Sequence, residues 1–295
     1  MEQEFTYIRD IHFINSNVSS LDSLREMYSN GLFSDVKLPE NLSQEIPGLS
    51  DNIKSPLKRR MSQLSLGVYQ ALQNGGAKNL REDDEIYLFT SFAEIDTSNK
   101  IIADLELNQS KLVSPVLFHN SVHNTPLGYY TIINKYHNYC LAVSDGINTG
   151  KSFVDLIKFL VRVNPEFVIV AGDEYSSFYD LEVKYKYQLY PSFVSYKIQK
   201  NVNEQKGFFL KHENCSWEQI KSFLCDYEYV FADKESFIEL KDKVNAELLT
   251  DYPIVGDAPI SIITRLALPF ILNLHGKTAV IGHFKGKYFL FEVVL

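Results

Sequence analysis

The sequence predicts an α/β fold, because a strand–helix–strand unit lies between residues 139 and 172 and further runs of strand length flank it. Residues 139–143 have the apolar character of a strand, and residues 167–172 form a second such run. Between them, five apolar side chains recur at the spacing of one helix face: Phe153, Leu156, Ile157, Leu160 and Val161. A crossover of this length implies two parallel strands joined in the right-handed sense.

The elements before this unit continue the alternation of strands and helices. Residues 5–14 and 85–91 are rich in β-branched and aromatic side chains, which predicts strands. Residues 57–72 predict a helix that ends at Gly75. Its buried face is predicted to contain Met61, Leu64, Val68, Tyr69 and Leu72.

The remaining segments show a weaker periodic pattern of apolar residues. Residues 260–272 predict an apolar helix, and residues 278–281 and 288–295 predict a hairpin around Gly286. The residues after 91 are expected to be a connecting segment. A polar stretch before the first helix predicts an irregular surface excursion, because it contains Pro39, Pro47, Gly48 and Pro56.

Composition limits the class of protein. The 295 residues are 45% hydrophobic and 22% charged, which suits a globular chain of one or two domains. A net charge of −8 argues against a nucleic-acid partner, since such proteins usually carry a basic stripe. No run is apolar enough to span a membrane. Residues 1–4 lack the basic flank of a signal peptide, so we expect a cytoplasmic protein.

The three cysteines, Cys140, Cys215 and Cys225, are odd in number and show no Cys-x-x-Cys spacing. Neither a disulfide framework nor a zinc site is therefore expected, and we predict no metal and no cofactor.

Residues 114–129 carry the most specific motif, Ser-Pro-x-x-Phe-x-Asn-Ser-Val-His-Asn-x-Pro-x-Gly-Tyr. This motif closely resembles a segment of the β-ketoacyl synthase family, in particular the short ketosynthase-like proteins of aryl polyene and flexirubin-type pigment clusters. The resemblance is clear over residues 55–175 and implies a thiolase-like fold, a layered αβαβα arrangement of two related halves. Since the chain is shorter than a full ketosynthase, the second half is expected to be truncated, with halves at residues 1–175 and 176–295.

In that family a catalytic cysteine occupies the turn between the strand and the helix of the unit described above. Here the resemblance places Asp145 at the nucleophile position, with Ser144 one residue away. A carboxylate is a poor attacker of a thioester but is well placed to cap the helix. Cys140 falls within the strand, where a buried and inert thiol is expected. The turn therefore lacks a thiol nucleophile.

The family also uses two histidines and a glycine-rich loop from the second half of the chain. The resemblance places Asp233 and Pro253 at the two histidine positions, and residues 284–288 at the loop. His119 and His123 are four residues apart but lie in an expected loop, so metal ligation is not predicted. His123 is expected to satisfy buried backbone groups near a subunit contact.

The resemblance implies a subunit without catalytic residues of its own, similar to a chain length factor. Such a subunit forms a heterodimer with a catalytic ketosynthase in polyene, polyketide or fatty-acid-type elongation, and the acyl carrier protein docks on the partner. The residues expected at the contact or tunnel are Phe118, Asn120, Val122, His123, Asn124 and Gly128. Two alternatives stay open: an acyl-transferring or condensing enzyme that uses Ser144 or Cys140, and a solitary acyl-binding protein.

Overall fold

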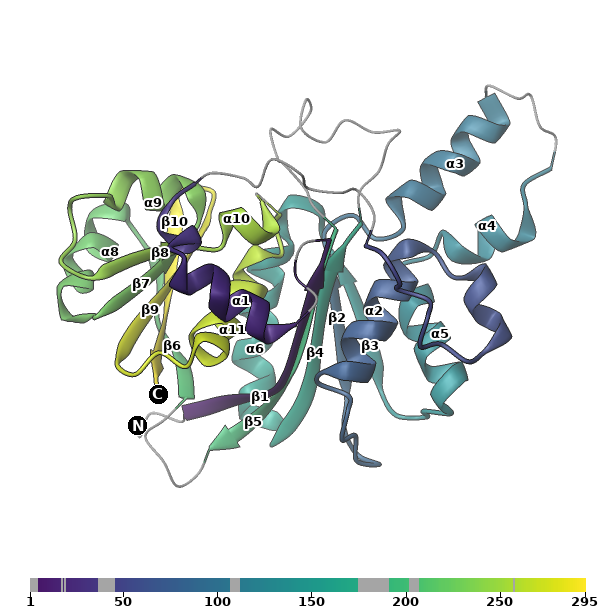
Figure 1. Ribbon diagram of the computed structural model, residues 1–295, viewed down its shortest axis with the longest axis horizontal. Coiled ribbons are helices and arrows are strands. Elements are labelled where there is room, and N and C mark those ends of the chain that lie inside the picture. Colours follow the sequence, from purple (N-terminus) through teal and green to yellow (C-terminus); the bar gives the residue numbers. More distant parts are fainter. Residues whose placement is uncertain are drawn as a thin grey trace.

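The computed structural model describes residues 5–16, 18, 20–36, 46–106, 112–174, 191–201, 207–256 and 258–295. Its strands form one mixed sheet with the order β3-β2-β4-β5-β1-β6-β10-β9-β7-β8 (Figure 1). Their bounds are β1 (Phe5–Asn15), β2 (Ile86–Thr90), β3 (Cys140–Ser144), β4 (Glu166–Asp173), β5 (Ser192–Asn201), β6 (Gly207–Cys215), β7 (Tyr229–Ala232), β8 (Glu247–Thr250), β9 (Lys277–Phe284) and β10 (Lys287–Val294).

The sheet consists of two repeats with the same topology. In the first, β2 lies parallel to β3 and β4, while β5 runs antiparallel to β4 and β1. In the second, β7 lies parallel to β8 and β9, while β10 runs antiparallel to β9 and β6. The repeats meet where Thr6 of β1 pairs with Phe208 of β6. The two related halves predicted for the fold are therefore present.

The repeats also locate the division between the halves. β5 follows residue 175 but pairs with β4 and β1, so the predicted division at residue 175 falls inside the first repeat. The strand order favours a division between Asn201 and Gly207. The second repeat keeps all five strands within residues 207–294, and it is shorter because its connections are shorter.

Helices cover both outer faces and fill the centre. α2 and α5 pack on the first repeat, α8 and α9 on the second, and α6 and α11 lie between them, which gives the αβαβα layers. The α-helices are α1 (Leu21–Ser29), α2 (Gln63–Asn74), α3 (Ile95–Glu106), α4 (Pro115–Asn120), α5 (Thr125–Asn134), α6 (Thr149–Val163), α8 (Trp217–Phe223), α9 (Lys234–Leu240), α10 (Tyr252–Val255) and α11 (Ser261–Leu272). Short 3₁₀ turns are η1 (Leu32–Ser34), η2 (Pro56–Arg60), η3 (Gly146–Asn148) and η4 (Leu224–Asp226). No helix of the described residues is long and apolar enough to cross a membrane.

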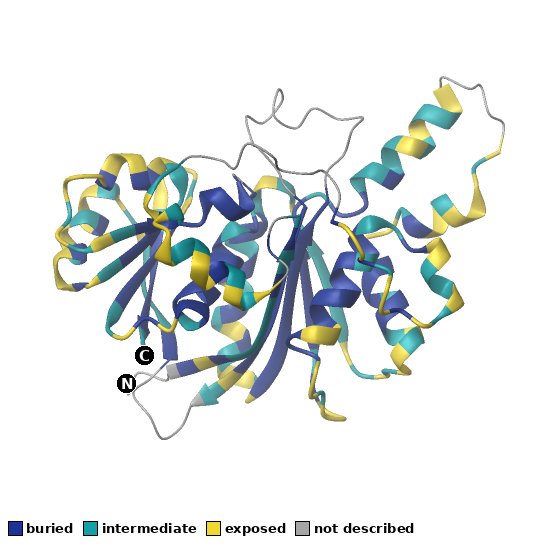
Figure 2. Cartoon of the chain, in the orientation of Figure 1, coloured by how far each residue is buried: buried dark blue, intermediate teal, exposed yellow. Residues whose placement is uncertain are grey.

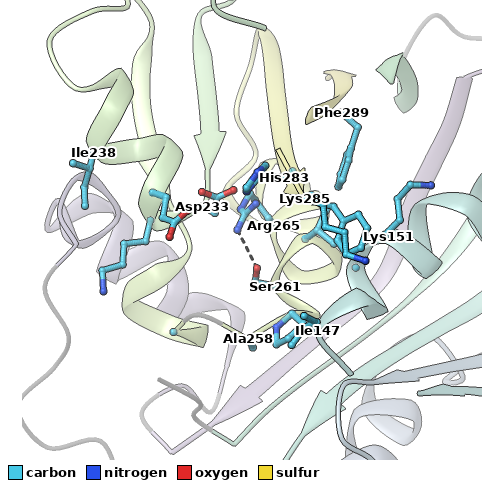
Figure 3. A pocket seen from close by; sticks show the side chains of 18 residues that line it. Ile147, Lys151, Asp233, Ile238, Ala258, Ser261, Arg265, His283, Lys285 and Phe289 are labelled. Carbon is cyan, nitrogen blue, oxygen red and sulfur yellow. Dashed lines mark hydrogen bonds between the residues drawn. The ribbon is translucent and has the colours of Figure 1, made fainter. Parts of the chain in front are cut away.

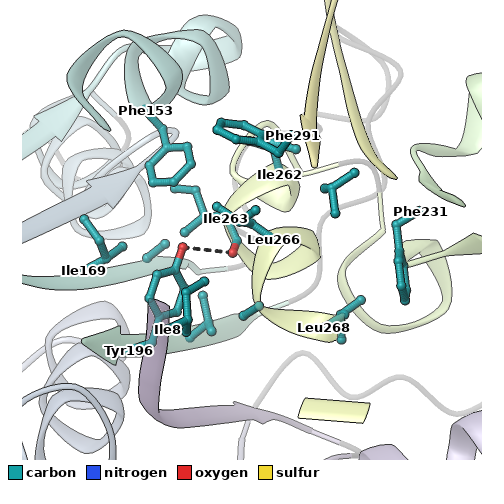
Figure 4. Close-up of a cluster of buried hydrophobic side chains, with 14 of the residues drawn as sticks. Ile8, Phe153, Ile169, Tyr196, Phe231, Ile262, Ile263, Leu266, Leu268 and Phe291 are labelled. Carbon is teal, nitrogen blue, oxygen red and sulfur yellow. Dashed lines mark hydrogen bonds between the residues drawn. The ribbon is translucent and has the colours of Figure 1, made fainter. Parts of the chain in front are cut away.

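The central layer holds the largest core, in which Phe153 of α6 and Leu266 of α11 are fully buried (Figure 4). The Tyr196 hydroxyl of β5 donates a hydrogen bond to the Ile263 carbonyl at 3.1 Å. This bond joins the first repeat to the central helix of the second. β2, β4, β5, β9 and β10 are buried along most of their length, whereas α3 and α4 are largely half-buried or exposed (Figure 2).

The predicted strands and the hairpin around Gly286 are confirmed, as are the helices α6 and α11. The helix predicted over residues 57–72 begins later, at Gln63, because the Ser62 hydroxyl accepts a hydrogen bond from the Ser65 N–H and caps it. Its predicted end at Gly75 is confirmed.

The surface excursion predicted before α2 is wrong for the part that the structure describes. Ile46, Leu49 and Ile53 are buried and pack in the same cluster as α2. Pro39 lies outside the described residues. The prolines and the glycine of this stretch make it irregular, but its apolar side chains still contribute to the core.

A buried ionic network lies at the start of β4. The Lys197 ammonium of β5 is fully buried and lies 2.6 Å from a carboxylate oxygen of Asp84 and 2.5 Å from one of Glu166. Arg81 reaches Glu166 at 2.6 Å, and Arg9 pairs with the same carboxylate. The network therefore joins β1, β4, β5 and the segment before β2.

Candidate functional site

The turn after β3 holds Asp145, whose side chain is exposed. Its carboxylate accepts hydrogen bonds from the Ser152 hydroxyl at 2.7 Å and the Asn148 amide at 3.5 Å. The residue at the N-cap of α6 is Asn148, and no backbone N–H of the helix is capped by a side chain there. The predicted capping role of Asp145 is therefore wrong, because its oxygens bind side chains instead.

The turn is fastened to the end of β2. The Ser91 carbonyl accepts hydrogen bonds from the Gly146 N–H at 2.9 Å and from the Ser144 hydroxyl at 3.2 Å. Gly146 has φ +55°, a left-handed conformation that favours glycine. The Ser144 hydroxyl thus donates to a carbonyl, and no base is among its described hydrogen-bond partners.

Cys140 lies in β3, as predicted, and is half-buried. Burial raises the pKa of its thiol to about 11. Since the thiolate is the nucleophilic form, almost none of this cysteine is reactive near neutral pH.

A cavity of about 500 Å³ opens beside this turn (Figure 3). Four segments line it: the start of α6, the start of α9, the residues leading into α11, and the β9–β10 hairpin. Ile147 and Gly150 belong to its lining, whereas Asp145 does not. A Cβ atom at Gly150 would lie 2.6 Å from the Pro259 carbonyl oxygen, so this position needs glycine where the two central helices approach.

Of the two positions that the resemblance assigned to histidines, Asp233 lines the cavity and Pro253 does not. Asp233 caps α9, since its carboxylate accepts the Ser236 N–H at 2.8 Å. Pro253 is buried within α10.

The β9–β10 hairpin contributes Phe284 and Lys285 to the lining, together with His283. The His283 ring is exposed and stacks on Tyr288, with ring centroids 4.6 Å apart. Its Nε2 accepts the Gly286 N–H at 2.9 Å, so Nδ1 carries the proton in the neutral ring. The predicted loop segment therefore reaches the cavity.

Arg265 is a lining residue that the sequence analysis missed. Its guanidinium is buried and forms an ion pair with Asp251 at 2.9 Å, and it also donates to the Ile281 carbonyl and the Ser261 hydroxyl. Burial raises the pKa of Asp251 to about 6, although the Arg265 charge opposes this rise. The sequence does carry one sign of a buried role for Arg265, because it is the single charged residue in the apolar stretch 260–272.

The chemistry available to this site follows from its lining. Among the lining residues that the structure describes there is no cysteine, and the Ser261 hydroxyl accepts from Arg265 and has no hydrogen bond to a base among the described residues. The described residues also contain no group of three or more metal-ligating side chains. The lining therefore offers no thiol that could take an acyl chain.

The motif at residues 114–129 folds into two helices. Ser114 caps α4 and Pro115 begins it, so the loop expected around His119 is wrong: this residue lies in the last turn of a helix. The Asn120 amide is buried, donates to the Arg60 carbonyl at 2.5 Å and accepts from the Tyr129 hydroxyl at 2.9 Å. Asn120 therefore stabilises the junction between α4, α5 and η2.

The other predicted contact residues lie at the surface. Phe118, Val122, His123 and Asn124 are exposed, and Gly128 is half-buried. Within the described part of the chain, His123 has no hydrogen bond to buried backbone groups, so that expected role is wrong within this chain. Its exposure leaves it available to another molecule.

Exposed apolar side chains are concentrated in one part of the chain. Of the 13 large hydrophobic residues that are exposed among the described residues, 11 lie between Ile102 and Val163. They belong to the segment from α3 to α6, which contains β3. Such a concentration is typical of an interaction surface.

A comparison of the sequence with models of protein families identifies the family. The family model for the β-ketoacyl synthase N-terminal domain matches residues 37–210. The chain belongs to this family. No curated protein matches this ketosynthase-family chain in sequence.

Solved structures of ketosynthases resemble it over nearly its whole length. A chain from the complex of the ketosynthase ApeO with its chain length factor ApeC, from Xenorhabdus doucetiae, matches with a TM-score of 0.64 at 14% identity, covering 98% of this chain and 99% of that one. The ishigamide ketosynthase/chain length factor matches with 0.68 at 10% identity, covering 99% and 100%. A β-ketoacyl synthase from Burkholderia phymatum STM815 matches with 0.68 at 10% identity, again covering 99% and 100%. Identities this low establish the thiolase-like fold alone.

Proposed function

We propose that this chain is a non-catalytic ketosynthase-like subunit that pairs with a catalytic β-ketoacyl synthase and limits the length of its product, in the manner of a chain length factor. The observation that carries this proposal is the concentration of exposed apolar side chains between Ile102 and Val163, the segment that contains β3. The turn at Asp145, which lacks a thiol, supports the non-catalytic part. Aryl polyene or flexirubin-type pigments are the proposed product class, and the carrier protein docks on the partner.

The edge of the sheet at β3 suits a protein partner. β3 pairs with β2 on one side, and no described strand pairs with its other side. α5 and α6 cover the two faces of β3. These helices carry the exposed side chains Ile132, 62% exposed, and Phe159, 59% exposed. An unpaired strand edge beside apolar side chains is a template for association with a second chain.

The opposite edge of the sheet, at β8, is covered. Phe33 of η1 is buried in the same cluster as Leu249 of β8. The Tyr28 hydroxyl of α1 donates a hydrogen bond to Glu247 at 3.0 Å. The contrast between the two edges favours β3 as the contact surface.

The nature of the partner is inferred from the similar structures, two of which contain a ketosynthase together with a chain length factor. A partner of the same fold could place its own strand edge beside β3 and extend the sheet across the contact. The predicted residues Phe118, Val122, His123 and Asn124 lie on the same part of the chain.

Phe159→Glu is expected to weaken binding of the ketosynthase partner by at least about tenfold, because it places a charge in an apolar contact. Binding can be measured by copurification and by titration calorimetry with a catalytic ketosynthase encoded near the gene. Ile238→Glu is the matched control, since Ile238 is 55% exposed but lies on α9 in the second repeat. Equal binding by the two variants would count against the β3 contact.

The alternative of acyl transfer through Ser144 or Cys140 has a direct test. After incubation with acyl carrier protein thioesters, intact-mass spectrometry is expected to show no acyl adduct, because Ser144 donates to a carbonyl and burial raises the pKa of Cys140. An adduct on either residue overturns the non-catalytic assignment.

A solitary acyl-binding role is favoured by one observation, the cavity of about 500 Å³. If this role is correct, the chain alone binds short acyl ligands, and product length is the same whether or not the chain is present with a ketosynthase. The proposed pairing predicts the opposite result for product length.

A further inference from the structure

Seven acidic side chains are buried among the described residues, and four of them are paired with cations. The pairs are Lys197 with Asp84 and Glu166, Arg265 with Asp251, and both Lys211 and Lys277 with Glu292. The other three acids, Glu94, Asp173 and Glu174, form no ion pair with a described residue. A buried charge without a partner is costly, so these three groups need a physical explanation.

The three acids without a cation lie at one edge of the sheet. β2 and β4 are neighbouring parallel strands, so their carboxyl ends meet at the same edge. Glu94 comes shortly after the end of β2, Asp173 ends β4, and Glu174 follows it. The uncompensated negative charge of the interior is therefore concentrated where these two strands end.

Glu94 and Glu174 have hydrogen-bond donors on every carboxyl oxygen. Both oxygens of Glu94 accept from side-chain hydroxyls, and both oxygens of Glu174 accept from backbone N–H groups. Hydrogen bonds that a carboxylate accepts favour its ionised form. These two groups are thus satisfied as acceptors, although no described cation balances their charge.

Asp173 is satisfied on one oxygen alone. Its Oδ1 accepts the Thr90 hydroxyl at 2.8 Å and the Ser91 N–H at 2.6 Å, whereas its buried Oδ2 has no hydrogen-bond partner among the described residues. The side chains are almost wholly buried, because Asp173 is 2% exposed and Ser91 is 1% exposed. The Ser91 hydroxyl acts on the pKa of this carboxyl group and so lies close to it, but its oxygen has no partner either.

We propose that Asp173 Oδ2 and the Ser91 hydroxyl oxygen bind a monovalent metal cation, Na⁺ or K⁺. Carboxylate and hydroxyl oxygens are ligands that hard cations prefer. The described residues contain no group of three or more metal-ligating acidic, histidine or cysteine side chains, so the multi-carboxylate site typical of Ca²⁺ is not formed. A water molecule would satisfy the two oxygens but would leave the carboxylate charge uncompensated.

The cation site would stabilise the turn that follows β3. The Ser91 carbonyl accepts the Gly146 N–H of this turn at 2.9 Å, so the loop that contains Ser91 also positions the turn. Binding of the cation needs no second protein chain. The inference therefore goes beyond the proposed function and does not depend on it.

Thermal unfolding of the full chain at pH 8 tests the site, since burial raises the pKa of Asp173 to about 6 and leaves it ionised there. Unfolding is compared in equal concentrations of NaCl, KCl and N-methylglucamine chloride, whose organic cation is too large for a site between two side chains. NaCl or KCl is expected to raise the unfolding temperature by about 5 °C over N-methylglucamine chloride, because a ligand that binds the folded state alone stabilises it. Equal ionic strength keeps general screening the same in all three salts.

Two variants locate the effect. Asp173→Asn keeps Oδ1 as an acceptor and removes the charge, so its unfolding temperature should be the same in the three salts. Ser91→Ala removes the second ligand, so its response should move to higher salt concentration. Asp226→Asn is the matched control: this carboxyl group is exposed in the second repeat, and the variant should keep the wild-type difference.

The cation site is overturned if the wild type unfolds at one temperature in all three salts, as it would with water alone between the two oxygens. It is also overturned if Asp173→Asn and Ser91→Ala both respond to the salts as the wild type does. If Asp173→Asn does not fold, the wild type and Ser91→Ala decide. If the salts act as expected but no ketosynthase binds, the proposed function fails and the cation site stands.

Discussion

Lys197→Met is expected to destabilise the fold by about 3 to 5 kcal/mol, since removal of one member of a buried ion pair leaves its partners uncompensated. The Lys197 ammonium is fully buried and contacts both Asp84 and Glu166. Methionine fills a similar volume, so the loss comes from the charge and not from a cavity. Arg81 and Arg9 are partly exposed and compensate the two carboxylates incompletely.

Urea-induced unfolding, followed by circular dichroism, measures this effect as a lower transition midpoint. Lys221→Met is the matched control: Lys221 pairs with Glu218 on the exposed surface, and such pairs contribute at most about 1 kcal/mol. Similar midpoints for the two variants would show that the buried network adds little to stability.

Arg265→Met is expected to cost about 3 to 5 kcal/mol at pH 8 and less at pH 5. Burial already raises the pKa of Asp251 to about 6 from an ordinary 3.8, with Arg265 opposing the rise. A group whose folded pKa lies above its unfolded value stabilises the fold below that range and loses this contribution as pH rises through the folded pKa. Without Arg265 the folded pKa rises further, so the variant loses most stability where Asp251 must ionise.

The double variant Arg265→Met with Asp251→Asn isolates the pair. An asparagine side chain cannot ionise, so the double variant is expected to be more stable at pH 8 than Arg265→Met alone, and its stability should depend less on pH. Unfolding midpoints of the wild type, the two single variants and the double variant at pH 5 and pH 8 give the coupling free energy. Additive losses, with no pH dependence, would contradict a buried ion pair at this site.

The elements that could be predicted are those whose own residues show a clear apolar pattern. The stripe of α6 and the apolar run of β4 are both visible in the sequence, and both are confirmed. α3 was missed because its pattern is weak: Thr97 is its one buried residue, and Ile102 and Leu105 are exposed. α4 was also missed, although Ser114 followed by Pro115 is a helix-start signal.

The residues of the candidate site also fall into those that could be predicted from the sequence and those that could not. The resemblance placed Asp233 and the β9–β10 hairpin near the turn at Asp145, and the cavity does contain Asp233 and Phe284. Arg265 and Lys197 carry no local sign of their partners, since their ion pairs form between segments that only folding brings together. Lys197 and Asp84, for example, are 113 residues apart in sequence.

The two ends of the sheet differ, and this difference limits how large an assembly can grow. η1 and α1 shield β8, while β3 ends the sheet without a described neighbour. A sheet that is open at one end accepts a single neighbour, and that neighbour uses up the open end. Association through β3 therefore stops at a closed pair, and the same contact cannot propagate into a fibre.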